Sequence, residues 1–136
     1  MDQDTRLEHV AIAVPNLDAA VAVYSAVLGR PDSGREVVES EQVEIALFDL
    51  GSTRLELLEP SAADSPVGRF LERRGAGLHH IALEVTDIEA ALERCQVAGL
   101  QTVGAAPRRG AGGRRVAFLH PAGTGGVLIE LSERIR

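Results

Sequence analysis

Two segments of this chain of 136 residues carry the same pattern, and this repetition restricts the fold more than any other feature. Residues 7–21 and 78–92 align at a constant offset of 71 positions, and the alignment places His9 on His80. Both segments join a strand-like apolar stretch to the beginning of a helix. Self-similarity at a fixed spacing indicates a duplicated structural unit, so we expect two copies of one module.

A second pair of segments supports the duplication. Residues 55–59 and 129–133 align at an offset of 74 positions, and this alignment places Glu56 on Glu130. Each half of the chain therefore carries one His near its beginning and one Glu near its end. Two His and two Glu residues from equivalent halves are the set that a symmetric metal site needs.

The segments that contain the histidines are predicted to be buried strands. Residues 7–14 and 78–85 are mainly apolar, which is typical of strands covered on both faces. Side chains alternate between the two faces of a strand, so His9 and His80 each share a face with alanine. The small neighbours leave room in front of each imidazole. His79 has the opposite parity and is expected to be structural.

The remaining pattern predicts the order βαβββ in each half. The expected fold class is α+β, with two tandem modules at about residues 7–60 and 78–133 in a single domain of residues 1–136. We expect the curved sheets of the two modules to pair into one metal-binding cleft. Residues 105–113 are expected to form a flexible glycine-rich loop. Helices are predicted at 17–28, 66–73 and 88–98, and the other strands at 37–40, 43–49, 53–59, 101–104, 115–119 and 127–133.

Composition excludes several classes of function. The net charge of −6 argues against a nucleic acid or an anionic membrane as the main partner. No apolar run approaches the roughly 18 residues of a membrane span. All 14 basic residues are Arg, which excludes Schiff-base chemistry on lysine. The one cysteine, Cys95, cannot form an intrachain disulfide, so nothing indicates an oxidising compartment and we expect a cytoplasmic protein. Cys95 lies on the apolar face of a predicted helix, so we expect its side chain to be packed.

Glu56 and Glu130 each lie within an apolar strand. A carboxylate in such a strand needs a cavity, a partner charge or a metal, because burying it alone is costly. A single His on a strand is most often structural, but here the His and Glu pattern occurs in both halves. Two imidazoles and two carboxylates suit a divalent ion used as a Lewis acid, namely Co, Mn, Ni, Mg or Zn. The set differs from the two-His, one-carboxylate sites of oxygen-activating iron enzymes, which keep the fourth position open.

Motifs along almost the whole chain match a known family. The matching segments are His9–Val14, Arg54–Pro60, Asp64–Pro66, Gly77–Ala82, Gly110–Gly113, Phe118–Pro121 and Gly125–Leu131. With these segments the chain resembles the vicinal-oxygen-chelate superfamily and, within it, the methylmalonyl-CoA epimerases. The His and Glu strands are shared across the superfamily, whereas the third and the last three segments are more specific to the epimerases.

The resemblance implies a divalent metal bound by His9, Glu56, His80 and Glu130. It implies interconversion of (R)- and (S)-methylmalonyl-CoA by a 1,1-proton transfer, with an acyl-CoA as the small-molecule partner. The C2 proton of such a thioester is weakly acidic, so a metal that stabilises the enediolate makes chemical sense. The resemblance also implies a homodimer, because chains of this size in the family commonly pair.

Inversion at C2 needs bases as well as a metal. Glu130, at the edge of the expected metal site, is one candidate. Some family members carry a second Glu on the strand predicted here at 43–49, where Glu44 is the candidate. The family commonly has a Gly before the Val of this strand, and this chain lacks it. With that gap, the position of the acid falls on Ile45 and Glu44 faces the other side of the sheet. Both registers stay open at this point.

Contacts to coenzyme A are expected from paired arginines and from the backbone of Gly110–Gly113, because guanidinium and backbone N–H groups bind phosphate. His120, which precedes a proline, is expected to be structural or to contact the substrate. The pairs are Arg73–Arg74, Arg108–Arg109 and Arg114–Arg115.

Two other functions fit the sequence. One is a different metal-dependent enzyme of the same fold, such as a glyoxalase I-like isomerase or an epimerase of another acyl-CoA. The other is a metal-free protein that binds a small molecule, as antibiotic-resistance members of the superfamily do. The presence of both Glu56 and Glu130 favours an enzyme, since a binding protein has no need of paired carboxylates.

Overall fold

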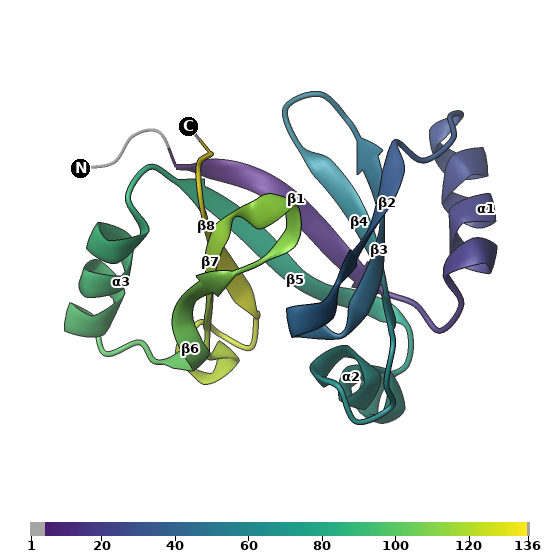
Figure 1. Ribbon diagram of the computed structural model, residues 1–136. Coiled ribbons are helices and arrows are strands. Elements are labelled where there is room, and N and C mark those ends of the chain that lie inside the picture. The colour runs from purple at the N-terminus through teal and green to yellow at the C-terminus, as the bar shows by residue number, and fades with distance from the viewer. Residues whose placement is uncertain (1–4, 136) are drawn as a thin grey trace. The chain divides into compact units, whose positions relative to one another are not determined.

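The computed structural model describes residues 5–135 and has a mixed α+β fold (Figure 1). Each half of the chain has the order βαβββ, and one further helix joins the halves, so the predicted duplication is confirmed. The elements are β1 (Arg6–Ala13), α1 (Leu17–Leu28), β2 (Gly34–Val38), β3 (Val43–Asp49), β4 (Arg54–Pro60), α2 (Pro66–Arg74), β5 (Gly77–Val85), α3 (Ile88–Val97), β6 (Thr102–Arg109), β7 (Arg115–Leu119) and β8 (Ile129–Glu133).

The described chain divides into two compact units. Residues 9–79 form one unit, and residues 5–8 together with 80–135 form the other. The sheet of the first unit has the order β2–β3–β4–β1, with β1 and β4 parallel. The sheet of the second unit has the order β5–β8–β7–β6, with β5 and β8 parallel. In each module, therefore, the strand that carries the His lies beside the strand that carries the Glu.

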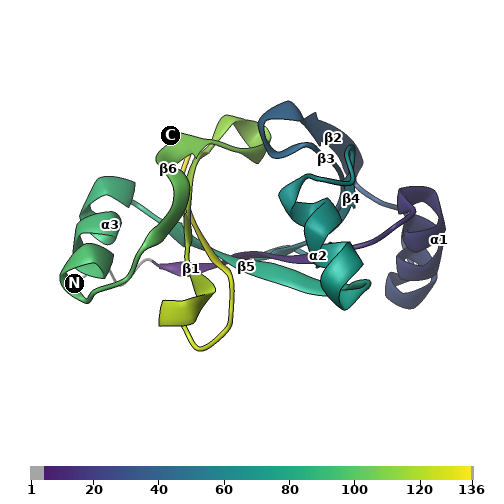
Figure 2. The same ribbon diagram turned by 90° about the horizontal axis from the view of Figure 1, so that it is seen from below.

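One helix of each module packs on its own sheet. In the first unit α1 packs on β3 and β4, and in the second α3 packs on β7 and β8 (Figure 1). The helix α2 also contacts β4, as the view in Figure 2 shows. The first buried cluster consists of Val14, Leu17, Ala20, Ala46, Phe48 and Leu57. The second consists of Val85, Ile88, Ala91, Ala117, Leu119 and Leu131.

The helices α1 and α3 both begin at a residue whose side chain caps the helix. The Asn16 side chain accepts a hydrogen bond from the Ala19 N–H at 2.9 Å, and the Asp87 side chain accepts one from the Ala90 N–H at 3.1 Å. Each cap satisfies a backbone donor that the first turn of a helix leaves without an intrahelical partner. The helix α1 ends at Gly29, whose φ of 69° is the left-handed conformation that glycine adopts without strain. These boundaries agree with the prediction.

A carboxylate from the last strand of each module supports the same helix ends. Glu59 accepts a hydrogen bond from the Leu17 N–H at 2.6 Å, and Glu133 accepts one from the Ile88 N–H at 3.1 Å. A negative charge at the N-terminus of a helix also interacts favourably with the helix dipole. The last strand of each module therefore holds its helix by a buried or partly buried polar contact as well as by apolar packing.

The strand predicted at 37–40 lies earlier in the chain. In the structure β2 ends at Val38, and a single 3-10 turn, Glu39–Glu41, follows it. The turn ends at Gln42, which has a φ of 55° and donates its N–H to the Glu39 carbonyl. A run of charged and polar residues has little tendency to extend a strand, which explains the difference.

The predicted loop at 105–113 is shorter than expected. The strand β6 continues to Arg109, because its pairing with β7 stops after Val103 and resumes at Arg108. Such an irregularity lets extra residues bulge out of a strand without ending it. A hydrophobic pattern cannot reveal this continuation, because the bulged residues face no partner strand.

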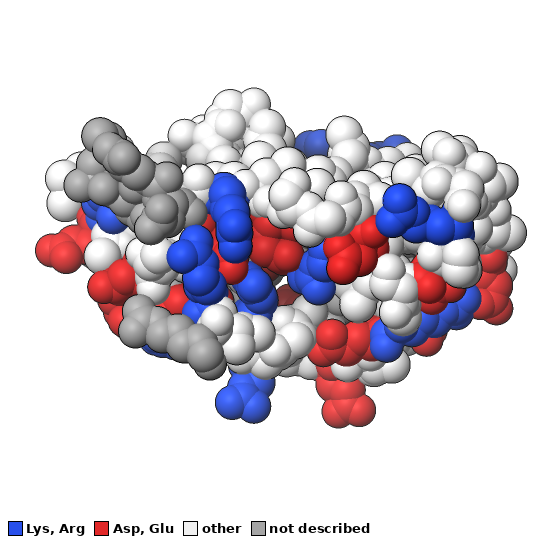
Figure 3. All heavy atoms as spheres, turned by 90° about the horizontal axis from the view of Figure 1, so that it is seen from above, with Lys and Arg blue, Asp and Glu red and all other residues white. Residues whose placement is uncertain are grey.

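The surface of the described residues mixes both signs of charge. On the face shown in Figure 3, blue arginine side chains lie next to red carboxylates. Among the described residues, no helix is both long and apolar enough to cross a membrane.

The helix α2 begins at a tightly packed turn. The Ser65 hydroxyl donates to the Ala62 carbonyl at 2.6 Å and accepts from the Gly68 N–H at 3.1 Å. A Cβ atom added at Gly68 would lie 2.5 Å from the carbonyl oxygen of Ala63 and 2.6 Å from that of Ala62. The backbone of this turn thus approaches Gly68 too closely for any other side chain.

We expect Gly68→Ala to lower the free energy of unfolding by about 1–3 kcal/mol, because the added methyl group forces backbone to move. The midpoint of urea unfolding, followed by circular dichroism, measures this loss. Arg69→Ala, at the next and exposed position of α2, is the control and should keep the wild-type midpoint within error. An unchanged midpoint for Gly68→Ala would contradict the close approach.

Candidate functional site

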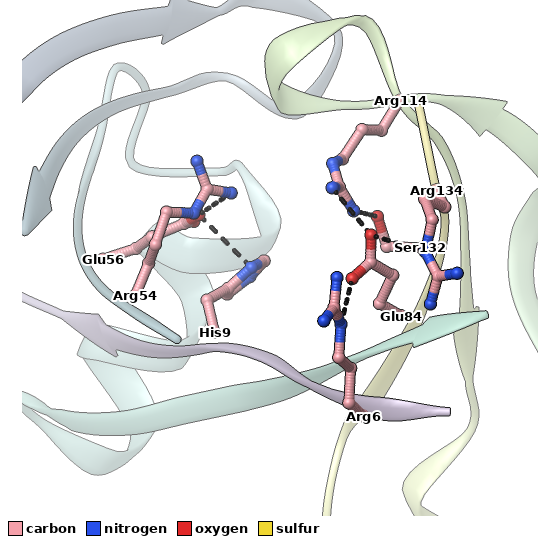
Figure 4. A network of polar contacts seen from close by, with 8 residues as sticks. All are labelled: Arg6, His9, Arg54, Glu56, Glu84, Arg114, Ser132 and Arg134. Carbon is pink, nitrogen blue, oxygen red and sulfur yellow. Dashed lines mark hydrogen bonds and ion pairs between the residues drawn. The ribbon is translucent and has the colours of Figure 1, made fainter. Parts of the chain in front are cut away.

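The first module brings one predicted His and Glu pair together. His9 lies on β1 and Glu56 on the parallel neighbour β4, and His9 Nδ1 is 3.3 Å from Glu56 Oε2. The two side chains are only 4% and 2% exposed. Figure 4 shows the imidazole directed at the carboxylate. The structure therefore makes a buried pair of ligand atoms from residues at opposite ends of the module.

Small residues lie next to this pair. Ala11 lies beside Glu56 in the pairing of β1 with β4, and both Ala11 and Ala13 are fully buried. They share the face of His9, as the alternation of the strand predicts. Ala11 is thus the residue of β1 directly next to Glu56.

The second module repeats the arrangement. His80 Nε2 is 3.1 Å from Glu130 Oε1, and the side chains are 6% and 10% exposed. Ala82 lies beside Glu130 in the pairing of β5 with β8. The ring of Phe118 contacts His80 edge-on, with 5.3 Å between the centroids, and limits how the imidazole can turn.

Each pair can supply two ligands to a metal ion. In both pairs a ring nitrogen and a carboxylate oxygen lie 3.1 to 3.3 Å apart, and both atoms are buried. Two ligand atoms that bind one ion at about 2.1 Å and at a right angle lie about 3 Å from each other. Imidazole nitrogen and carboxylate oxygen are donors that suit divalent ions such as Co, Mn, Ni, Mg and Zn. The residues present therefore fit a divalent ion.

The register of β3 decides which of its residues shares the face of Glu56. Leu47 lies directly opposite Glu56 on β4, and Ile45, two residues away, has the same parity. Glu44 lies opposite Glu59, whose carboxylate is bound to the beginning of α1. The side chain of Glu44 thus lies on the helix-covered face of this sheet. Of the two registers that the sequence allows, the structure has the one that places Ile45 on the face of Glu56 and Glu44 on the opposite face.

The second compact unit contains a charged cluster that the sequence did not predict. Glu84 is only 4% exposed, yet Arg6 Nε donates to its Oε2 at 2.9 Å and Arg114 Nη2 donates to its Oε1 at 3.1 Å. Arg134 Nε lies 3.5 Å from the same Oε1. Arg114 also donates to the buried Ser132 hydroxyl at 3.0 Å (Figure 4).

This cluster affects the ionisation of Glu84. Burial opposes ionisation most strongly, but the hydrogen bonds and charges of Arg6 and Arg114 together outweigh it and hold the pKa of Glu84 below its ordinary value. The parity of Glu84 with His80 was visible in the sequence. The identity of its partners was not, because the three arginines come from three separate segments.

Arginines of two predicted pairs have partners within the protein. Arg115 forms ion pairs with Glu89 and Glu133, and the guanidinium of Arg108 lies 5.2 Å from the centre of the Phe118 ring. These contacts use the charge and the planar face of each guanidinium. Contacts between the arginine pairs and coenzyme A stay a prediction.

The other residues singled out from the sequence have structural contacts. His79 packs edge-on against Phe70 of α2, with 4.9 Å between the ring centroids. His120 Nδ1 accepts a hydrogen bond from the Ala122 N–H at 3.0 Å and caps a short turn. Cys95 packs beside the buried cluster of the second module, as predicted, and burial raises the pKa of its thiol.

Comparison with known proteins identifies relatives over nearly the whole chain. The family described as the Glyoxalase/Bleomycin resistance protein/Dioxygenase superfamily matches residues 8–118. The ethylmalonyl-CoA/methylmalonyl-CoA epimerase of Cereibacter sphaeroides is 43% identical over 94% of this chain and 97% of its own length. The mitochondrial methylmalonyl-CoA epimerase of Homo sapiens is 41% identical over 94% of this chain and 73% of its own length.

A solved structure has the same fold. It is that of a variant of the Streptomyces coelicolor methylmalonyl-CoA epimerase in complex with 2-nitronate-propionyl-CoA. The TM-score is 0.91 at 37% sequence identity, and the match covers 96% of this chain and 98% of that chain.

We expect Glu84→Gln to lower the free energy of unfolding at neutral pH by roughly 1.5–3 kcal/mol, because charge-assisted hydrogen bonds from two arginines are weakened. The folded pKa of Glu84 is depressed, so its contribution is present at neutral pH and is lost as the pH falls through that folded value. The difference between variant and wild type should therefore shrink in acid. Urea unfolding at neutral and acidic pH measures it, with the exposed Glu89→Gln as control. A difference that is the same at both pH values would contradict this assignment.

Proposed function

Because this chain belongs to the glyoxalase/bleomycin resistance protein/dioxygenase superfamily, we propose that it is an epimerase that interconverts (R)- and (S)-methylmalonyl-CoA. The observation that supports this most directly is the buried His and Glu pair that recurs in each module. It occurs in a chain 41% and 43% identical to two named epimerases. A protein that only binds a small molecule has no need of two such carboxylates.

We propose that one divalent ion is held by His9, Glu56, His80 and Glu130. When bound, the ion supplies a Lewis acid that stabilises negative charge on the thioester oxygen while the C2 proton is away. Within each pair the ring nitrogen and the carboxylate oxygen are already buried and 3.1 to 3.3 Å apart, as two ligands of one ion would be. Ala11 and Ala82 lie beside the two carboxylates in the strand pairing.

Glu130 is the proposed general base. Its carboxylate lies beside His80. The next residue of the strand, Leu131, is packed in the apolar core and so holds the strand that carries Glu130 in place. A carboxylate on one face of C2 can accept the proton, and inversion is complete when a proton is delivered to the opposite face. A well-placed base contributes about 10²–10⁴-fold to a rate. Glu44 is the second acid suggested by the sequence, and its side chain lies on the other face of its sheet from Glu56.

The proposal includes three further features that the sequence led us to expect. The partner is a small-molecule acyl-CoA, the chain forms a homodimer, and the protein is cytoplasmic. The Cereibacter sphaeroides relative is named for ethylmalonyl-CoA as well as methylmalonyl-CoA. Ethylmalonyl-CoA is therefore the alternative substrate to compare in the same assay.

The direct test is exchange at C2. The protein, loaded with Co²⁺ or Mn²⁺, is incubated with (S)-methylmalonyl-CoA in D2O, and mass spectrometry follows the deuterium content while a chiral assay follows the (R) isomer. We expect deuterium to enter at C2 as the (R) isomer appears. Absence of both with metal present would refute the proposed reaction, and protein without metal is the control.

We expect Glu130→Gln to slow exchange at least about 10²-fold, since the amide cannot accept the proton. Glu44→Gln is the matched control and should keep nearly the wild-type rate, because Glu44 lies on the helix-covered face. Initial rates at saturating metal and substrate measure both effects. Near-wild-type exchange by Glu130→Gln, or a large loss in Glu44→Gln, would show that the base is wrongly assigned.

A further inference from the structure

Glu56 has a second cationic contact besides His9. Arg54 Nη2 donates to Glu56 Oε2 at 3.2 Å, and His9 Nδ1 lies 3.3 Å from the same oxygen. Arg54 and Glu56 are two residues apart on β4, so their side chains emerge from the same face of the strand. Figure 4 shows the guanidinium and the imidazole on either side of this carboxylate.

The contact places one partly exposed group against one buried group. The Glu56 side chain is 2% exposed, whereas that of Arg54 is 30% exposed. A carboxylate that carries a charge-assisted hydrogen bond to a guanidinium has fewer accessible rotamers and a more narrowly defined direction. Arg54 therefore fixes the orientation of Glu56 while its own charge remains partly hydrated.

The corresponding position on the strand of Glu130 is not an arginine. The alignment that places Glu56 on Glu130 places Arg54 on Leu128, whose side chain has no hydrogen-bond donor. The two carboxylates that the duplication makes equivalent are thus supported differently by their own strands. The strand of Glu56 supplies a charged hydrogen-bond donor two residues before the carboxylate, and the strand of Glu130 supplies an apolar residue there.

We propose that Arg54 is a positioning residue that holds Glu56 in one orientation as a permanent ligand, so that the two equivalent carboxylates have different tasks. Glu56 keeps its place, and proton transfer falls to Glu130. This inference rests on the proposed metal site. Groups that hydrogen-bond to a metal ligand typically change metal affinity by 10–100-fold when they are removed.

The test compares the metal affinity of three proteins. Arg54→Leu copies the residue of the second module, Arg54→Lys keeps a charge and a donor but loses the planar fork, and wild type is the reference. Competition between each protein and a chelator for Co²⁺ gives the affinity. We expect Arg54→Leu to bind Co²⁺ about 10–100-fold more weakly, and Arg54→Lys to lie between it and wild type. Arg35→Leu, which removes another partly exposed arginine of the same unit, should leave the affinity unchanged.

Activity at saturating Co²⁺ separates positioning from substrate contact. If Arg54 acts through the ligand, excess metal should restore kcat in Arg54→Leu without a change in KM for methylmalonyl-CoA. Unchanged Co²⁺ affinity with a raised KM would overturn the inference and make Arg54 a substrate contact. Equal loss of affinity in Arg54→Leu and Arg54→Lys, with lower thermal stability of both metal-free variants, would overturn it in favour of a general role in stability. A wild-type protein that binds no Co²⁺ would instead refute the proposed metal site itself.

Discussion

A carboxylate buried beside an imidazole is the constraint that each module must satisfy. Glu56 and Glu130 are almost inaccessible to water, and an ionised carboxylate in that position costs several kcal/mol unless charge or hydrogen bonds compensate it. The parallel pairing of the first and last strands brings a His to each Glu, and a buried alanine on the neighbouring strand lies directly beside each Glu. The strand order places each His beside its Glu. The small residues lie next to the pair, and the apolar packing of each sheet holds the two strands in position.

The last strand of each module has two acidic residues whose side chains make contacts on opposite faces of the sheet. Glu56 faces the imidazole, whereas Glu59, three residues later, is on the other face and holds the first N–H of α1. Glu130 and Glu133 repeat this division with His80 and the beginning of α3. Residues three apart on a strand have side chains on opposite faces of the sheet. One short segment therefore contacts the imidazole on one face and the helix on the other. The register of that strand is thereby tied to the position of its helix.

The duplication made much of the structure predictable. Capping residues such as Asn16 and Asp87 marked the helices, and strand parity separated His80 from His79. The buried cluster at Glu84 could not be predicted, because its arginines come from segments whose proximity depends on the tertiary fold. The continuation of β6 beyond the break in its pairing with β7 could not be predicted either, because the sequence there has no alternation of apolar and polar residues. For Glu44 the sequence allowed two registers that differ by one residue, and only the pairing of β3 with β4 distinguishes them.

The strand order has a consequence for folding. His9 and Glu56 lie at opposite ends of the sequence of the first module, and one helix and two strands separate β1 from its partner β4. Contacts of such long sequence separation form late and slow the folding of a domain. An unfolded chain therefore offers no preformed pair of ligand atoms, and an ion that binds only the completed modules would stabilise them by mass action. In a cell, the supply of metal would then influence how long each newly made chain survives as well as how fast it turns over substrate.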